Sequence, residues 1–332
     1  MVHAEPLVYY IPYQHRCSAL APGITRSMSR LSYLTKHHPL GLGICTLILS
    51  IFLFDLQGVI IKFTGDRYNV QQIALLRNIL GIVPTLIALH YSERWHDSGK
   101  RMRVSNWPLA LSRGFMIAGA QLCFYFSIVQ MELATATTLA FAGPLFITLL
   151  SIPLLGHTVG IWRSVAVLIG FLGVVMVMRP DIGGFSPIML LPLGAAFFYA
   201  LASVTSRYFD SSVPTALINI YSSAGAVLIM LIVVTTNDSW QSVPFGIDWL
   251  LFACMGMTGG CAVLLLITSY RMADPSSLSP FEYFGIPFSF TLGWLFFNEA
   301  PFERIFPGAL FIIAGGLLVL WRERKLKANS KT

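Results

Sequence analysis

Apolar residues follow one another along most of this chain in long runs, without a regular alternation of apolar and polar positions. One α-helix needs about 20 apolar residues to cross the hydrocarbon of a bilayer, which is the typical length of these runs. A transmembrane β-barrel would instead alternate lipid-facing and lumen-facing residues with a period of two. The pattern therefore predicts an all-α integral membrane protein.

The runs and the turns between them predict ten transmembrane helices. Polar turn-forming clusters such as Thr64-Gly65-Asp66 and Asn237-Asp238-Ser239 interrupt the apolar sequence. Residues 129–133 alone separate the third run from the fourth, and we interpret these runs as two helices joined by a tight turn because together they are too long for one span. The predicted spans cover residues 40–63, 70–90, 108–129, 134–155, 158–178, 186–206, 213–235, 248–270, 276–297 and 304–321.

The composition supports the same class of protein. Of the 332 residues, 55% are hydrophobic and 11% are charged, whereas a soluble domain has about 25% charged residues. The net charge of +7 comes from Lys and Arg residues that gather near helix ends, where they act as topology signals, so we predict no nucleic-acid partner. The five cysteines form no C-x-x-C pair and are interpreted as small packing residues, with no disulfide, metal site or cofactor.

The distribution of Lys and Arg among the connections predicts the orientation. With a cytoplasmic N-terminus, 16 of the 22 lie on the cytoplasmic side, and Lys62, Arg67, Arg179 and Arg304 lie on the outer side. Because cytoplasmic loops carry the excess of basic residues, both termini are predicted to face the cytoplasm. The chain would then be a multi-pass protein of the cell membrane, the inner membrane of a bacterium.

Two tails flank the predicted spans. Residues 1–39 lack the apolar segment and cleavage site of a signal peptide, and they are predicted to form a cytoplasmic N-terminal tail. Met28 opens a basic stretch that leads into the first helix, and the hypothesis that the first 27 residues are dispensable stays open. Residues 323–332 are predicted to form a basic cytoplasmic C-terminal tail.

An internal repeat divides the spans into two groups of five. Residues 127–180 and 269–324 each contain a small-residue helix with a proline near its middle, Pro144 or Pro287, followed by a glycine-bearing apolar helix and a basic residue. We predict two five-helix repeats, over residues 40–180 and 181–322. Because five is odd, the second repeat would be inverted in the bilayer relative to the first, as in many secondary transporters.

Short motifs recur in order in the two halves. They are Gly143-Pro144-Leu145-Phe146, Gly170-Phe171-Leu172-Gly173-Val174 and Arg179-Pro180, then Pro280-Phe281-Glu282-Tyr283 and Asn298-Glu299. In this order the chain resembles the drug/metabolite transporter superfamily, in its EamA-type ten-helix branch. The family typically ends its fourth helix in Gly-Glu, whereas this chain has Gly156-His157, so a role for a glutamate there does not carry over. The resemblance implies a carrier for small, often amphipathic metabolites that works by alternating access around a central cavity lined by both halves.

Four ionisable residues lie inside predicted spans, where a charge is costly and is a functional candidate by default. Asp55 and Arg77 lie about 12 Å and about 10 Å from the outer ends of their helices. Arg113 and Glu282 lie about 8 Å and about 9 Å from the cytoplasmic ends. Each acid either neutralises the base at its own depth in a structural ion pair or contributes to a substrate site. Lys62, near a helix end, is interpreted as a snorkelling anchor.

Among these four ionisable residues, Glu282 is the strongest functional candidate. Pro280 and Pro287 flank it, and prolines free backbone carbonyls that can line a cavity, so Glu282 is predicted to bind a substrate amine or a proton. Neutral polar residues on helices that the family places around the cavity complete the predicted site, with interhelical hydrogen bonding as their alternative role. The predicted substrate-binding residues are Asp55, Gln57, Arg77, Arg113, Gln121, Tyr125, Thr138, Tyr199, Glu282 and Tyr283.

The predicted function is secondary active transport of a small organic metabolite, such as an amino acid or a related amphipathic compound. The sequence has no G-x-x-x-x-G-K-[ST] loop for an ATP-driven pump and no H-E-x-x-H or G-x-S-x-G motif of an enzyme, so we predict that it is not an enzyme. An intramembrane enzyme or a passive channel without carrier activity is the alternative. The predicted partners are the lipid bilayer and a small-molecule substrate, while proton coupling and a homodimer stay open.

Overall fold

The computed structural model describes residues 39–92, 95–96, 99, 102, 104, 106–155, 161–178, 186–205, 208–209, 213–272, 278 and 281–329. Every regular element in these ranges is a helix. Residues 1–38 of the predicted N-terminal tail lie outside the described residues. The helices are α2 (Pro39–Gly65), α3 (Val70–His90), α5 (Trp107–Gln130), α6 (Leu133–Ala140), α7 (Gly143–Leu155), α8 (Ile161–Met178), the 3-10 helix η2 (Pro187–Met189), α9 (Leu190–Thr205), α10 (Thr215–Thr236), α11 (Ile247–Met272), α13 (Gly285–Phe297), α14 (Phe302–Ile305) and α15 (Gly308–Asn329).

Seven helical stretches are long and apolar enough to cross a membrane. They are α2, α3, α5, α6 together with α7, η2 together with α9, α10 and α11. Helices α8, α13 and α15 are apolar over shorter lengths. The prediction of an all-helical protein with many apolar helices is confirmed for the described residues, while the count of ten spans stays a prediction.

Three predicted spans are interrupted. The fourth consists of α6 and α7, which meet at Phe141 and Ala142, and α13 of the ninth starts only at Gly285. Pro144 and Pro287, predicted near the middle of a helix, lie instead in the first turns of α7 and α13. The first turn tolerates proline because its N–H groups have no intrahelical partner. The tenth predicted span consists of α14 and α15, and α15 continues to Asn329, into the predicted C-terminal tail.

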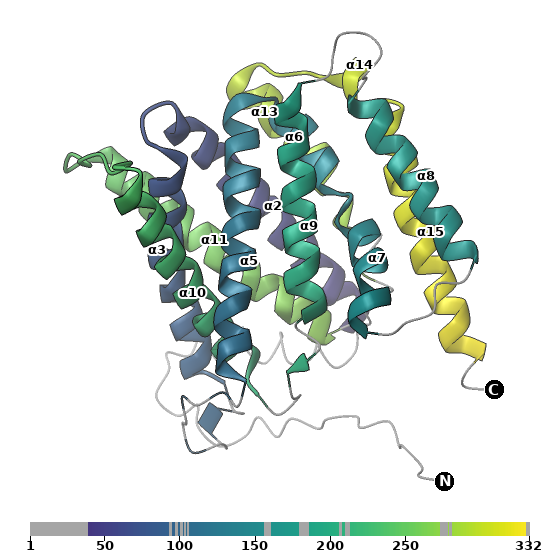
Figure 1. The fold of residues 1–332 in the computed structure, drawn as a ribbon, viewed down its shortest axis with the longest axis horizontal. Helices are drawn as coiled ribbons and strands as arrows, with labels where there is room; N and C mark the ends of the chain where they lie inside the picture. Colours follow the sequence, from purple (N-terminus) through teal and green to yellow (C-terminus); the bar gives the residue numbers. More distant parts are fainter. Residues whose placement is uncertain are drawn as a thin grey trace, which may run out of the picture.

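The helices lie side by side in one bundle (Figure 1). Helix α2 packs along α11, α5 packs between α9 and α10, and α3 contacts both α10 and α11. Helices α8 and α15 pack along each other at the opposite edge of the bundle from α3 and α10. Helix α8 is the last helix of the first predicted repeat, and α15 is the last helix of the second.

Glycines bring several helix pairs into backbone contact, as is common where membrane helices pack. Between α5 and α10, a Cβ on Gly114 would lie 2.7 Å from the Cα of Gly225. Between α8 and α15, a Cβ on Gly173 would lie 2.6 Å from the carbonyl oxygen of Gly308, and one on Gly315 would lie 2.7 Å from the backbone nitrogen of Gly170. No larger residue fits at these positions without separating the helices.

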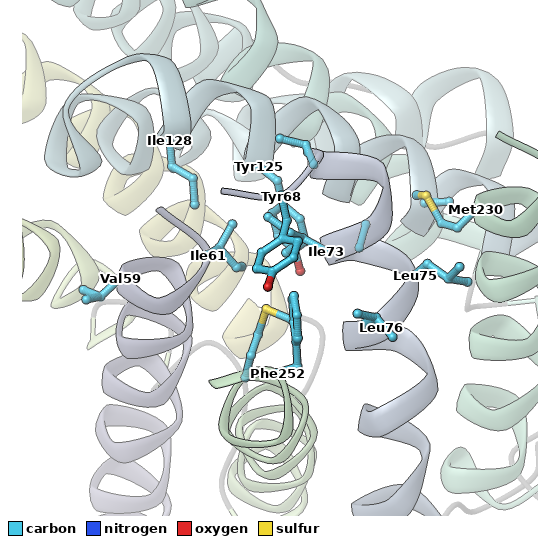
Figure 2. Close-up of a cluster of buried hydrophobic side chains, with 14 of the residues drawn as sticks. Val59, Ile61, Tyr68, Ile73, Leu75, Leu76, Tyr125, Ile128, Met230 and Phe252 are labelled. Atoms are coloured by element: carbon cyan, nitrogen blue, oxygen red, sulfur yellow. The ribbon is translucent and has the colours of Figure 1, made fainter. Parts of the chain in front are cut away.

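The largest buried apolar cluster joins residues of α2, α3, α5, α6, α10, α11 and α13. Tyr68, Tyr125 and Phe252 gather near its centre (Figure 2), and the rings of Tyr68 and Phe252 meet edge to face with centroids 5.2 Å apart. Tyr68 lies in the short connection between α2 and α3. The cluster therefore fills the bundle toward the end at which α2 ends and α3 begins.

Candidate functional site

A network of polar side chains crosses the interior between α2, α3 and α5. Gln57 Nε2 donates to the Tyr125 hydroxyl at 3.1 Å, and Gln57 Oε1 accepts from Arg77 Nη2 at 3.5 Å. Asn78 Nδ2 donates to Gln121 Oε1 at 2.6 Å, and Gln121 Nε2 donates back to Asn78 Oδ1 at 3.2 Å. These five residues are called the Gln57 network, and four of them were predicted as site residues from the sequence.

Two glycines leave room around the guanidinium of the Gln57 network. A Cβ on Gly259 of α11 would collide with Gln57 Oε1 and lie 2.8 Å from Arg77 Nη2. A Cβ on Gly81 of α3 would lie 3.9 Å from Arg77 Nη1. The charged group of Arg77 thus has backbone, not side chains, on these two sides.

Asp55 does not join the Gln57 network. Its side chain is buried, and its Oδ2 has no hydrogen-bond partner in the described part of the chain. The predicted ion pair between Asp55 and Arg77 is wrong, because the ion pairs among the described residues do not include it. Similar depth in the bundle does not place two residues on the same face of a helix. Asp55 and Gln57 lie about 160° apart around α2, and the face that meets Arg77 carries Gln57.

Ion pairs gather at one end of the bundle, the upper end in Figure 1, where α13 and α14 lie. Lys62, at the end of α2, pairs with Glu299 and also donates to the Met131 carbonyl at 2.7 Å. Glu299 accepts a further hydrogen bond from the backbone N–H of Leu133 at 3.0 Å. The side chains of Lys62 and Glu299 are only 11% and 21% exposed, so the interpretation of Lys62 as a snorkelling anchor is wrong.

The local sequence positions Glu299 for this contact. Asn298 ends α13 in the left-handed region, at φ 57° and ψ 31°, a conformation that asparagine tolerates at a helix C-terminus. The backbone N–H of Glu299 then bonds to the Gly293 carbonyl at 3.1 Å. The Asn298-Glu299 motif thus turns the chain so that the carboxylate meets Lys62.

Two more ion pairs lie at the same end. Arg67 pairs with Asp248 at 2.5 Å, and Arg304 lies 3.8 Å from Glu132. The Tyr68 hydroxyl donates to Asp248 at 2.6 Å, and this hydrogen bond to a carboxylate, together with burial, raises the pKa of Tyr68. We call this region, defined by Lys62, Arg67, Glu132, Asp248, Glu299 and Arg304, the ion-pair end.

A second polar group lies among α5, α9, α10 and the segment before α13. Arg113 Nε donates to the Ala202 carbonyl at 3.0 Å, and Nη1 lies 3.4 Å from the Ser222 hydroxyl. The Tyr199 hydroxyl lies close enough to both Arg113 and Glu282 to interact with their charges. The described residues include no ion pair between Arg113 and Glu282, so the predicted direct pairing of these two is wrong, although both share Tyr199 as a neighbour.

Two predicted site residues make other contacts. Thr138 is buried, and its hydroxyl donates to the Ala134 carbonyl of its own helix at 2.7 Å. Tyr283 is also buried, with its ring 5.5 Å from that of Phe141 and its hydroxyl against Gly316 of α15. Neither contact is the interhelical hydrogen bond given as the alternative: Thr138 bonds within its own helix, and Tyr283 packs between helices.

Sequence reasoning missed Asn78, Glu299 and Asp248. Asn78 is a polar residue deep in an apolar run beside Arg77, which is a signal that could have identified it. Glu299 was noted only as part of a motif, and Asp248 lies at a helix start where a carboxylate is ordinary. No three His, Cys, Asp or Glu side chains within the described residues gather closely enough to hold a metal ion.

Three of the named relatives found by comparison with known proteins align along most of this chain. The chain is 24% identical over 285 residues to the S-adenosylmethionine uptake transporter of Rickettsia prowazekii, covering 85% of this chain and 94% of the relative. It is 26% identical over 301 residues to the riboflavin transporter of Vibrio cholerae, covering 87% and 96%. It is 26% identical over 280 residues to the pseudopaline exporter of Pseudomonas aeruginosa, covering 84% and 93%.

The fold is also found in a solved structure, and the family match covers both halves of the chain. A protein of known crystal structure, 19% identical, superposes with a TM-score of 0.59 over 86% of this chain and 98% of the other. The EamA-like transporter family matches residues 41–179 and again residues 186–321. The predicted resemblance is confirmed, and this multi-pass membrane protein belongs to the EamA-like transporter family.

Proposed function

We propose that this chain is a secondary active transporter that moves a small organic metabolite across the cell membrane by alternating access. The observation that carries the proposal is the Gln57 network, which holds an arginine and four neutral polar side chains inside an apolar bundle. Polar groups are costly within a bilayer and usually mark the pathway of a solute. Membership of a transporter family supports the same activity.

The ion-pair end supports alternating access, in which a site is closed on one side at a time. Each of the pairs Lys62–Glu299, Arg67–Asp248 and Glu132–Arg304 joins a residue of the first matched segment to a residue of the second. These contacts must break when the two segments separate at this end. We infer that the ion-pair end is the closed side in the state described.

Glu282 is proposed as the acid that binds a cationic group of the substrate or a coupling proton. Glu282 and Arg113 both lie close to Tyr199. A change in the charge of Glu282 would therefore change the electrostatic potential at Tyr199. Energy would then come from an ion gradient or from the gradient of the substrate itself.

We further propose ten spans in two inverted five-helix repeats, with both termini in the cytoplasm and the ion-pair end outside. Labelling of single cysteines introduced at positions 98, 238 and 328 tests this topology. Position 238 should react from the outer side, and positions 98 and 328 should react from the cytoplasmic side. Reaction of positions 98 and 238 from the same face would overturn the topology.

The named relatives differ in both substrate and direction, since two are named for uptake or transport and one for export. We therefore propose the substrate only as a small amphipathic metabolite, such as an amino acid or a related compound. Purified protein in proteoliposomes should take up a member of a metabolite panel, and a preloaded substrate should drive counterflow. Flux without counterflow would indicate a channel, and covalent turnover of a compound would indicate an intramembrane enzyme.

A further inference from the structure

Arg77 carries a positive charge that no acidic side chain in the described part of the chain balances. Its hydrogen bonds go to two neutral oxygens, Asn78 Oδ1 at 3.4 Å and Gln57 Oε1 at 3.5 Å, which are long for this kind of contact. Its Nε is buried and has no partner there. Because a guanidinium has five N–H donors, most of its hydrogen-bonding capacity is unused.

The acidic residues that form ion pairs within the described residues do not neutralise Arg77. Glu132, Asp248 and Glu299 pair with Arg304, Arg67 and Lys62 at the ion-pair end. Asp55 lies on a different face of α2 from Gln57, and it forms no ion pair within the described residues. Tyr125, a titratable side chain close to Arg77, is buried with its hydroxyl bonded to Gln57.

The side chain of Arg77 is partly exposed within the bundle. Arg77 lies about 10 Å from the start of α3, and its side chain is neither fully buried nor fully exposed. Gly81 and Gly259 flank it without side chains, and Gln57 and Asn78 each accept one hydrogen bond from it. This is a fixed, partly open donor group within the bundle.

We propose that Arg77 binds a carboxylate of the transported compound. This inference rests on the proposed transport function and adds the chemical class of the substrate to it. A planar guanidinium matches a carboxylate with two parallel hydrogen bonds, and the carboxylate would supply both the missing acceptors and the missing negative charge. In the apolar bundle this contact should favour a carboxylate over a neutral isostere by at least about tenfold.

Competition between matched compounds tests the inference. Uptake of the panel compound into proteoliposomes is measured with nicotinate or nicotinamide, pantothenate or panthenol, and N-acetylmethionine or N-acetylmethioninamide as competitors. Within the pair that competes best, the carboxylate should inhibit wild-type protein at a concentration at least about tenfold lower than its neutral partner. Arg77→Gln should abolish this preference, and Arg77→Lys, which retains the charge, should keep part of it.

The outcomes separate this inference from the proposed function. Transport that shows no preference for a carboxylate, or a preference that survives in Arg77→Gln, would overturn the role of Arg77 and leave the transporter proposal intact. Absence of uptake for the whole panel would overturn both. If Arg77→Gln fails to insert into the membrane, Arg77→Lys decides the question: a weaker carboxylate preference than in wild type supports the contact, and an unchanged preference would overturn it.

Discussion

Glu299→Gln removes the negative charge at the ion-pair end while keeping the size of the side chain. Glu299 accepts hydrogen bonds from Lys62 and from the Leu133 N–H, and the paired side chains are 11% and 21% exposed. An exposed ion pair contributes at most about 1 kcal/mol, and breaking a buried one costs about 3–5 kcal/mol. Between these limits, we expect the closed arrangement to lose about 2 kcal/mol relative to an open one, which is a change of about 30-fold in their ratio.

The reaction rate of a buried cysteine measures that ratio. Val59 of α2 is 6% exposed and belongs to the apolar cluster near this end. In a background without the native cysteines, Val59→Cys should react with a membrane-impermeant maleimide only when the end opens. Glu299→Gln or Lys62→Met should raise this rate about 30-fold. The double variant should show less than the product of the two single effects, because the partners are in contact.

Two control variants make the assay specific. Asp66→Asn removes an exposed carboxylate at the same end that forms no ion pair within the described residues, and it should leave the rate unchanged. Phe245→Cys, at a fully exposed position between α10 and α11, should react equally in every background. A Val59→Cys rate that Glu299→Gln leaves unchanged would refute the reasoning that charge holds this end closed.

Other substitutions test single contacts. Gly114→Ala would place a Cβ 2.6 Å from the Ala226 nitrogen and should lower the free energy of unfolding by about 1–3 kcal/mol in a thermal melt, whereas Gly41→Ala, with nothing within 4 Å, should not. The effects of Asp55→Asn and Arg77→Gln on stability should add within about 0.5 kcal/mol, and a larger coupling would show that the two side chains meet after all. Because the pKa of Tyr68 is raised in the folded state, its contribution to stability is complete below its ordinary pKa and is lost as the pH rises through the folded value. The melting temperature should therefore fall above about pH 10, and less steeply in Tyr68→Phe; equal slopes would contradict this. Glu282→Gln should insert normally but lose transport or its response to a pH gradient, and a wild-type rate with wild-type pH dependence would exclude the proposed role.

Most of the helical framework could be predicted because the length of an apolar run is a one-dimensional property of the sequence. The interruptions were harder. In the sequence, a proline that kinks a helix cannot be distinguished from one that begins a new helix, and this holds for Pro144 and Pro287. The turns are seen only in the packing, where Phe141 lies against Gly285, so closely that a Cβ on the glycine would be 2.8 Å from the Phe141 ring. Helix ends within a span depend on such tertiary contacts.

The partners of the polar residues could be predicted only in part. Gln57, Arg77, Gln121 and Tyr125 were identified as site residues because a polar side chain in a long apolar run is conspicuous. Which of them touch depends on rotation about each helix axis, and depth along the axis carries no information about that rotation. Asp55 was therefore paired with Arg77 wrongly, and the contact between Lys62 and Glu299, residues 237 positions apart, was not foreseen.

The glycine contacts between α8 and α15 restrict how these two helices can move against each other. Each half contributes one of these helices, and a slip of one residue along the contact would place a larger side chain where only Gly170, Gly173, Gly308 and Gly315 fit. We therefore expect α8 and α15 to move as one unit and not to slide along each other. Gly114 and Gly225 form the same kind of contact between α5 and α10, so we expect any relative motion of the halves either to preserve such contacts or to separate whole helices.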